Sequence, residues 1–110
     1  MPEEVFKEMI VKFNQKAAED PKLAKELAGV RRVVEIDVSD GESFNFVLEN
    51  AHVGELLKGK VERPDILVIG SRDTFLQMRS GELRPMKALA LKKIQVKATL
   101  EDMLRLRKFF

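Results

Sequence analysis

The spacing of the apolar residues changes abruptly near Arg31, and this change constrains the fold more than any other feature of the sequence. Over residues 3–18, apolar side chains recur every three or four positions, which is the stripe of an amphipathic helix: Val5, Phe6, Met9, Ile10, Phe13 and Ala17. After Arg31 they recur at every second position, as in a half-buried strand: Val34, Ile36 and Val38. A chain with both periods is expected to pack helices on a sheet.

Turn and capping residues divide the rest of the first half. Asp20-Pro21 predicts an N-cap and the start of a short helix that ends at Gly29. Asp40-Gly41 predicts a tight turn into a second strand, whose inner face is Phe44, Phe46 and Leu48. A third, weaker strand is expected within residues 53–62, which contain two glycines.

The second half continues with alternating strands and helices. Residues 66–69 are apolar on both faces, so this strand is expected inside the sheet. Ser71 is expected to cap a helix that Gly81 ends, and Pro85 to begin the next one. The inner residues of the second of these helices are predicted to be Met86, Leu89 and Ala90.

The last strand and helix are predicted from residue 94 onward. Apolar residues alternate with polar ones at Ile94, Val96 and Ala98, and Thr99 and Asp102 have the spacing of a capping box. The inner side of the helix that follows is predicted to be Leu100, Met103, Leu104 and Phe110. The predicted fold class is therefore α/β (α+β), with a mixed sheet and helices packed on it.

Length and composition predict one cytoplasmic domain over residues 1–110. The chain has 110 residues, 45% of them hydrophobic, which is enough for one core. No apolar run reaches the 18 or so residues of a membrane span, and the first ten residues lack the apolar region of a signal peptide. The chain has no cysteine, so disulfides and thiolate chemistry are excluded, and many Lys, Glu and Arg residues are typical of thermophile proteins.

Charge is distributed unevenly between the two halves. Residues 1–55 contain 12 acids and 7 bases, whereas residues 56–110 contain 6 acids and 13 bases. One interpretation is an ordinary solvated surface; the other is a basic face for anionic lipid headgroups or an acidic partner. Nucleic acid is not expected as a partner, because the chain has no Tyr or Trp for base stacking and no dense arginine cluster.

No catalytic or metal-binding motif is present in the sequence. His52 is the only histidine and has no neighbouring catalytic or ligating partner. The glycines form neither a dinucleotide fingerprint nor a P-loop, and Ser71 and Ser80 are not in a nucleophile motif. Acid pairs fall at expected helix starts, where they complement the helix dipole. We therefore expect no enzyme activity, no metal and no cofactor.

Residues 64–91 resemble the sterol carrier protein type-two family. The elements shared with that family are an Asp that opens an apolar strand, an acidic helix start, a Gly-x-Leu and an x-Pro-x-Lys-Ala before a final strand: Asp65, Asp73, Gly81 with Leu83, and Pro85 with Lys87 and Ala88. The meander and amphipathic helix before this segment follow the family's order, so the resemblance covers nearly the whole chain. The chain departs from the family on both sides of the last strand, where the family often has glycines. Here the sequence reads Leu-Lys-Lys at residues 91–93 and Ala-Thr at residues 98–99.

The resemblance implies a five-stranded mixed sheet with helices on one face and an apolar tunnel between them for a fatty acid, acyl chain, sterol or similar lipid. Flexible methionines adapt to varied apolar guests, which is one reason to place them there. The tunnel residues expected on this basis are Leu76, Met78, Met86, Leu89, Ile94, Val96, Met103 and Leu104. Non-enzymatic binding or transfer of an apolar lipid is the expected function.

Two alternatives about partners remain open at this stage. The same fold with a core filled by its own side chains would serve as a homodimer or as an accessory domain of a lipid-modifying enzyme. Separately, the last helix would dock on anionic membranes if its cations face outward: Arg105, Arg107 and Lys108. A peroxisomal address is not expected, because residues 108–110 read Lys-Phe-Phe.

Overall fold

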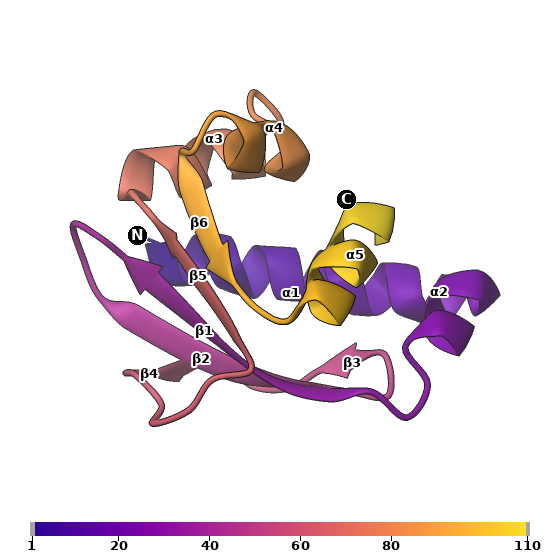
Figure 1. Ribbon diagram of the computed structural model, residues 1–110. Helices are drawn as coiled ribbons and strands as arrows, with labels where there is room; N and C mark the ends of the chain where they lie inside the picture. Colours follow the sequence, from indigo (N-terminus) through magenta and orange to yellow (C-terminus); the bar gives the residue numbers. More distant parts are fainter. Residues whose placement is uncertain (1, 110) are drawn as a thin grey trace.

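A computed structural model describes residues 2–109, apart from the side chain of Phe109. The elements in chain order are α1 (Pro2–Glu19), α2 (Pro21–Glu26), β1 (Arg31–Val38), β2 (Ser43–Glu49), β3 (His52–Val53), β4 (Leu57–Lys58), β5 (Ile66–Gly70), α3 (Arg72–Ser80), α4 (Pro85–Ala90), β6 (Ile94–Lys97) and α5 (Leu100–Phe109). Figure 1 shows α1 running along the sheet. Helix α2 lies at the C-terminal end of α1, and α3 and α4 lie beside β5 and β6. The mixed α/β architecture is the one that the sequence predicts.

One mixed sheet holds all six strands of the described chain, in the order β3-β2-β1-β5-β6, with β4 also paired with β2. Strand β1 pairs antiparallel with β2 and parallel with β5, and β6 pairs antiparallel with β5. The apolar strand β5 therefore lies between two neighbours, as its two apolar faces predict. Only the strand count differs from the expected five.

The extra strand comes from the segment expected to form one strand within residues 53–62. It pairs with β2 twice, through His52–Val53 and through Leu57–Lys58, and leaves the ladder between them. Leu56, in this gap, packs against the main core. The single-strand prediction is wrong because burying Leu56 requires the backbone to leave the edge of the sheet.

Helix boundaries follow the capping residues that the sequence contains. The side chain of Asp20 accepts hydrogen bonds from the first turn of α2, and that of Ser71 accepts one from Thr74 N–H in α3. Gly81 ends α3 with a φ of 86°, a conformation that glycine adopts without steric cost. Thr99 Oγ1 accepts from the backbone N–H of Asp102 at 3.2 Å, so this half of the expected capping box is confirmed.

The core lies between the helices and one face of the sheet, in two clusters. In the main cluster, Phe6 of α1 packs edge-to-face on Phe44 and Phe75, with ring centroids 5.5 and 4.9 Å apart. Gly70 lies under this cluster, where an added Cβ would approach Phe75 and Ile94 to 3.1 Å. The second cluster joins α1, α2 and the residue before β3: Ala17, Leu23, Leu27 and Ala51.

The predicted inner residues of two helices are only partly confirmed. In α4, Leu89 packs against the main core and Met86 is partly buried, but Ala90 is exposed and the buried residue is Ala88. In α5, Leu100 and Leu104 are 75% and 55% exposed, and the buried residue is Asp102. The inward prediction for these two leucines is wrong because Asp102 turns toward Arg32 of β1 and fixes the rotation of the helix. Phe110, also expected inside, lies outside the described residues.

Among the described residues, no helix combines the length and the apolar character that crossing a membrane requires.

Candidate functional site

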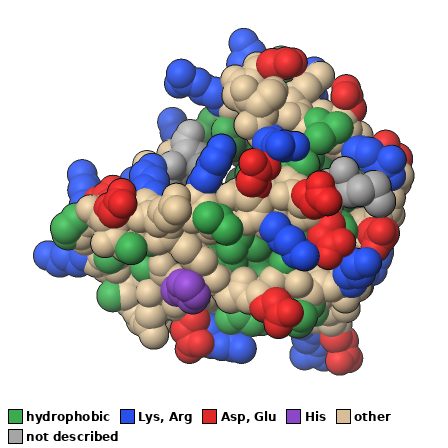
Figure 2. All heavy atoms as spheres, turned by 180° about the vertical axis from the view of Figure 1, so that it is seen from behind, with side chains coloured by type: hydrophobic (Ala, Val, Ile, Leu, Met, Phe, Trp, Pro, Cys, Tyr) green, Lys and Arg blue, Asp and Glu red, His purple; other side chains and the backbone are tan. Residues whose placement is uncertain are grey.

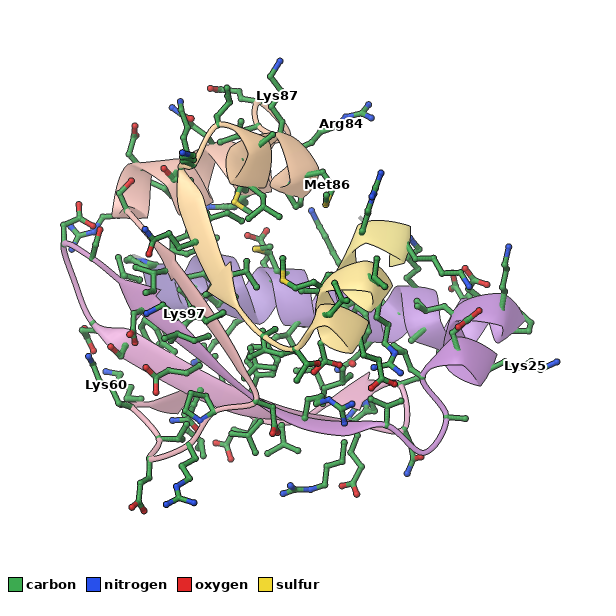
Figure 3. All side chains as sticks on the ribbon, viewed as in Figure 1. Lys25, Lys60, Arg84, Met86, Lys87 and Lys97 are labelled. Atoms are coloured by element: carbon green, nitrogen blue, oxygen red, sulfur yellow. The ribbon has the colours of Figure 1, made fainter. Side chains whose placement is uncertain are left out.

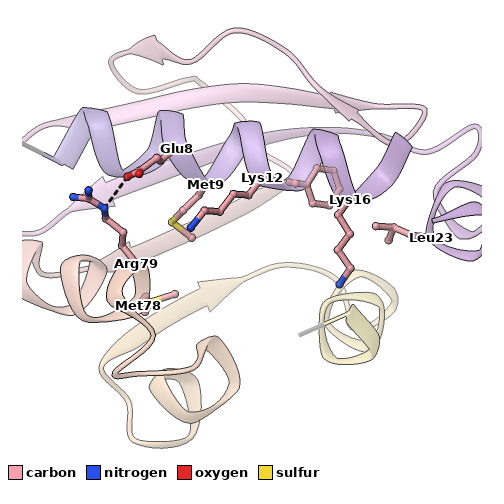
Figure 4. Close-up of a pocket in the computed structure, with 8 residues that line it drawn as sticks. Glu8, Met9, Lys12, Lys16, Leu23, Met78 and Arg79 are labelled. Atoms are coloured by element: carbon pink, nitrogen blue, oxygen red, sulfur yellow. Dashed lines mark ion pairs between the residues drawn. The ribbon is translucent and has the colours of Figure 1, made fainter. Parts of the chain in front are cut away.

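A hollow of about 270 Å³ lies between α1, α2 and α3 in the part of the chain that the structure describes. Its floor is apolar and consists of Met9 and Phe13 of α1, Leu23 of α2 and Met78 of α3. Its rim is charged and consists of Glu8, Lys12, Lys16 and Arg79 (Figure 4). We call it the α1–α3 pocket. An apolar floor with a few polar groups at the rim is the usual form of a small-molecule site.

Helical spacing on α1 brings the pocket residues together. Residues 8, 9, 12, 13 and 16 are separated by steps of one, three and four, so they lie on one side of the helix. Met9 and Met78 pack against the main core, and Phe13 packs against the second cluster. The pocket therefore lies where the two core clusters meet, which is where packing leaves room.

The charges on the rim are not balanced. Arg79 Nε lies 2.7 Å from Glu8 Oε2, and this ion pair uses the rim's only acid. Lys12 and Lys16 form no ion pair with any residue that the structure describes. In Figure 4 the Lys12 side chain runs beside Met9, and the Lys16 side chain extends from α1 toward α5. The apolar stems of such side chains can lie along a ligand while the ammonium groups stay at the rim.

Phe13 also lines a second, smaller pocket of about 60 Å³ beneath α5. The other residues there come from the turn between α2 and β1, from β1, β2 and β5, and from α5: Leu27, Val30, Arg32, Leu48, Ile66, Asp102, Arg105 and Leu106. Phe13 is therefore the lining residue that the two pockets share.

Met78 is the one residue of the expected tunnel set that lines the α1–α3 pocket. Three others belong to the main core: Ile94 is buried, and Leu89 and Val96 pack against it. Met86 and Met103 are partly buried, and Leu76 and Leu104 are 39% and 55% exposed. The structure thus spreads the eight side chains over the core and the surface.

Sequence reasoning missed the rest of this pocket, although part of the signal was present. The α1 stripe identified Met9 and Phe13 as inward residues, but not as ligand contacts. Lys12 and Lys16 lie four residues apart beside that stripe, and this spacing is the only trace of a cationic rim in the sequence.

The cations of α5 are largely occupied by acids. Arg105 Nη1 donates to Asp102 at 2.8 Å and Arg105 Nη2 to Glu101 at 3.0 Å, and the Arg105 side chain is only 22% exposed. The expectation that it faces outward is therefore wrong. Lys108 pairs with Glu26 of α2, and its ammonium group lowers the pKa of that carboxyl. Of the three cations, Arg107 alone has no ion pair with a described residue.

A pair of carboxyls lies on the opposite face of the sheet. Glu35, on β1, is 4% exposed and accepts a 2.8 Å hydrogen bond from Val61 N–H. Burial raises the pKa of Glu35, and the hydrogen bond and charge of Asp37 raise it further, while Val61 and Lys60 act in the opposite direction. Asp37 Oδ1 is buried with no hydrogen-bond partner among the described residues, so a proton on Glu35 gives it a donor.

Glu35→Gln is expected to stabilise the fold at neutral pH by about 1 kcal/mol and to change little at acidic pH. The folded chain holds the Glu35 proton more tightly than the unfolded chain does, so stability is lost as pH rises through the raised pKa. Glutamine keeps the Val61 bond and donates to Asp37 without titrating. Thermal unfolding across pH measures the effect, with exposed Glu42→Gln as the control. A loss of stability at neutral pH would contradict this account.

His52 lies exposed on β3, and the histidine is visible at the surface in Figure 2. Among residues 2–109, no group of three or more histidine, aspartate or glutamate side chains lies where it could hold a metal ion. The geometry thus offers a non-covalent pocket as the candidate site.

The sequence matches the model of a known protein family. The model of the SCP-2 sterol transfer family matches residues 11–110. This chain belongs to that family. A comparison with curated protein sequences finds no match. Family membership makes lipid binding or transfer the general class of function for this SCP-2 domain.

Solved structures share the fold of this SCP-2 domain at low sequence identity. The palmitated SCP2L2 from Aedes aegypti is 19% identical with a TM-score of 0.62, and the match covers 93% of this chain and 91% of that one. UbiJ-SCP2, a ubiquinone synthesis protein, is 15% identical with a TM-score of 0.56 and coverages of 84% and 77%. The sec-alkylsulfatase Pisa1 from Pseudomonas sp. is 13% identical with a TM-score of 0.58. That match covers 74% of this chain but only 13% of the sulfatase, so the SCP-2 fold also occurs as part of much longer chains.

Proposed function

We propose that this SCP-2 domain binds the acyl chain of an anionic lipid, such as a fatty acid, in the α1–α3 pocket and catalyses no reaction on it. The observation that carries the proposal is an apolar floor beneath two lysines that no described acid neutralises. The floor suits a hydrocarbon chain, and Lys12 and Lys16 suit a carboxylate or phosphate at its end. Membership of the SCP-2 sterol transfer family supports the class of ligand.

The size of the pocket limits how much of the chain it holds. A volume of about 270 Å³ is just below the usual range of roughly 300–1,000 Å³ for small-molecule sites. A long acyl chain therefore needs more room, and the pocket beneath α5, which shares Phe13 as a lining residue, would provide it. Each buried methylene contributes about 0.8 kcal/mol, so six of them already provide useful affinity. The Aedes aegypti relative, solved in a palmitated form, makes a fatty acid the first ligand to test.

Replacing Lys12 and Lys16 together by glutamine is expected to weaken fatty-acid binding about tenfold. Each exposed charge pair is worth about 0.2–1 kcal/mol, and two act on the same headgroup. The measurement is displacement of a fluorescent fatty-acid probe. A fatty alcohol of equal chain length is the second ligand, since it keeps the hydrocarbon and lacks the charge.

The matched control variant changes two exposed lysines of α2, Lys22 and Lys25, to glutamine. It should bind acid and alcohol as the parent does. A tenfold loss for both ligands in the Lys12/Lys16 variant would mean that the stems, not the charges, make the contact. No loss for either ligand would place the binding site elsewhere.

A second candidate function is supported by the packing of the core. Ile94, Leu89 and Val96, expected around a tunnel, fill space with one another and with the phenylalanine cluster. A domain filled in this way would act as a homodimer or as an accessory domain of a lipid-modifying enzyme, and the fold shared with UbiJ-SCP2 fits this alternative. Native mass spectrometry of freshly purified protein separates the two. Retained lipid favours the binding function, and a lipid-free dimer favours the accessory one.

A further inference from the structure

The chain between Leu83 and Leu100 contains five cations and no acid. It covers α4, the turn after it and β6. Three of these cations lie on α4 and its ends, together with an exposed leucine. We call this set the α4 rim: Arg84, Lys87, Leu91 and Lys92.

The α4 rim is exposed and electrostatically unbalanced. All four residues are exposed, and Leu91 is 53% exposed although it is apolar. None of the three cations forms an ion pair with a described residue. Arg84 and Lys87 point away from α4 into solvent in Figure 3, and Lys and Arg side chains project from the same end of the molecule in Figure 2. The cations of α5 differ, since Arg105 and Lys108 already hold acids.

The backbone at Lys92 is a second, independent observation. Its φ is 59°, in the left-handed region that glycine adopts far more easily than a residue with a Cβ. Lys92 follows α4 at the position where helices commonly end with glycine. Its own N–H donates to Leu89 O, and Lys93 N–H donates to Ala88 O, so the strained conformation is held in place. A charged side chain therefore occupies a site where glycine would fold with less strain, and such outliers often mark function.

Edge protection accounts for the two remaining cations of the segment. Lys93 directly precedes β6, the edge strand of the sheet, and Lys97 is its last residue; both side chains are exposed. Lysines on an edge strand prevent it from pairing with another sheet. The α4 rim is not on a strand, so this explanation does not extend to it.

We propose that the α4 rim is a docking surface for a membrane that contains anionic phospholipids. Cations without acid partners complement the negative surface of such a membrane, and Leu91 among them can enter the interface between headgroups and acyl chains. Helix α4 follows α3, which carries Met78 of the α1–α3 pocket. Docking at the rim would therefore place the membrane beside the elements that hold the lipid.

The first experiment measures binding to vesicles of phosphatidylcholine alone and of phosphatidylcholine mixed with phosphatidylserine. The parent protein is expected to bind only the anionic vesicles, and less at 1 M than at 0.1 M salt because the Debye length falls from about 10 to 3 Å. Changing Arg84, Lys87 and Lys92 to glutamine should reduce the partition coefficient about 100-fold, or about fivefold for each charge. The matched control changes three exposed cations of α2 and the β4–β5 loop to glutamine: Lys22, Lys25 and Arg63. Its partition coefficient should stay close to that of the parent.

Lys92→Gly separates docking from folding. It removes one charge and the left-handed strain together, so the melting temperature should hold or rise while partitioning falls about fivefold. An equal loss in the control triple variant would show that net charge, not the α4 rim, draws the protein to vesicles. Stronger binding to an acidic polyglutamate peptide than to anionic vesicles would identify a protein partner and overturn the membrane proposal. Equal binding to neutral and anionic vesicles would overturn it too.

The same preparations are then tested with the fatty-acid probe in the absence of vesicles. The α4-rim variants should retain the probe affinity of the parent, since none of the changed residues lines the pocket. Loss of vesicle binding with intact probe binding supports the docking surface. Absence of probe binding with intact vesicle binding would contradict the proposed function and leave the docking surface standing.

Discussion

Replacing Asp102 by alanine is expected to cost about 3 kcal/mol of stability and to release α5 from the sheet. Asp102 is 3% exposed and accepts from Arg32 Nε at 3.1 and 2.9 Å and from Arg105 at 2.8 Å. The hydrogen bond from Arg32 to Asp102 raises the pKa of Arg32, against the effect of burial. Removing one partner of a buried ion pair leaves the other without compensation, which typically costs about 3–5 kcal/mol. We take the lower value because Arg32 is 25% exposed.

Thermal unfolding and limited proteolysis measure this effect. For a domain of this size, each kcal/mol lowers the melting temperature by about 4 °C, so a fall of about 12 °C is expected. Cleavage should appear first within α5. Glu101→Ala is the matched control, because Glu101 also forms an ion pair with Arg105 but is 70% exposed; its effect should stay within about 0.5 kcal/mol.

A double variant tests whether the charge or the shape of the pair is required. Arg32→Met with Asp102→Leu removes both charges and keeps apolar bulk, so it should recover much of the lost stability. If Asp102→Ala lowers the melting temperature no more than Glu101→Ala does, α5 is held by apolar packing and the ion pair is incidental.

The orientation of α5 also shows where sequence reasoning stops. Leu100 and Leu104 have the helical spacing of a core stripe, and they are exposed. What turns the helix is an ion pair between residues that lie 70 positions apart in the chain. Periodicity records contacts within one helix, and it holds no information about a partner on a distant strand.

Local signals predicted most of the remaining fold. The caps at Asp20, Ser71 and Gly81 and the alternation in β1 depend on neighbouring residues only, and the structure confirms them. The candidate site was harder to predict because it forms between elements. Met9 and Phe13 belong to an ordinary amphipathic stripe until Met78 is brought opposite them by the fold. Glu35 alternates like a solvent-facing residue, and the β4–β5 loop covers it.

Replacing Met78 by tryptophan is expected to weaken fatty-acid binding about 50-fold while leaving stability nearly unchanged. Met78 packs against the main core, as Leu89 does, but it also lines the α1–α3 pocket, so a larger side chain at this position has open space to enter. Excluding about three methylenes of the ligand, at about 0.8 kcal/mol each, accounts for the loss. Probe displacement and thermal unfolding are measured on the same sample.

Leu89→Trp is the matched change at a residue that packs against the main core and does not line the α1–α3 pocket. Overpacking there should cost about 1–3 kcal/mol of stability and leave probe affinity nearly intact. If the lipid lies between α1 and α3, Met78→Trp should therefore lower the probe affinity, whereas Leu89→Trp should lower the stability. The reverse result, with probe binding blocked at Leu89 and kept at Met78, would move the ligand under α4. That outcome would restore the tunnel that the family resemblance implies, and the lysines of α1 would then be ordinary surface charges.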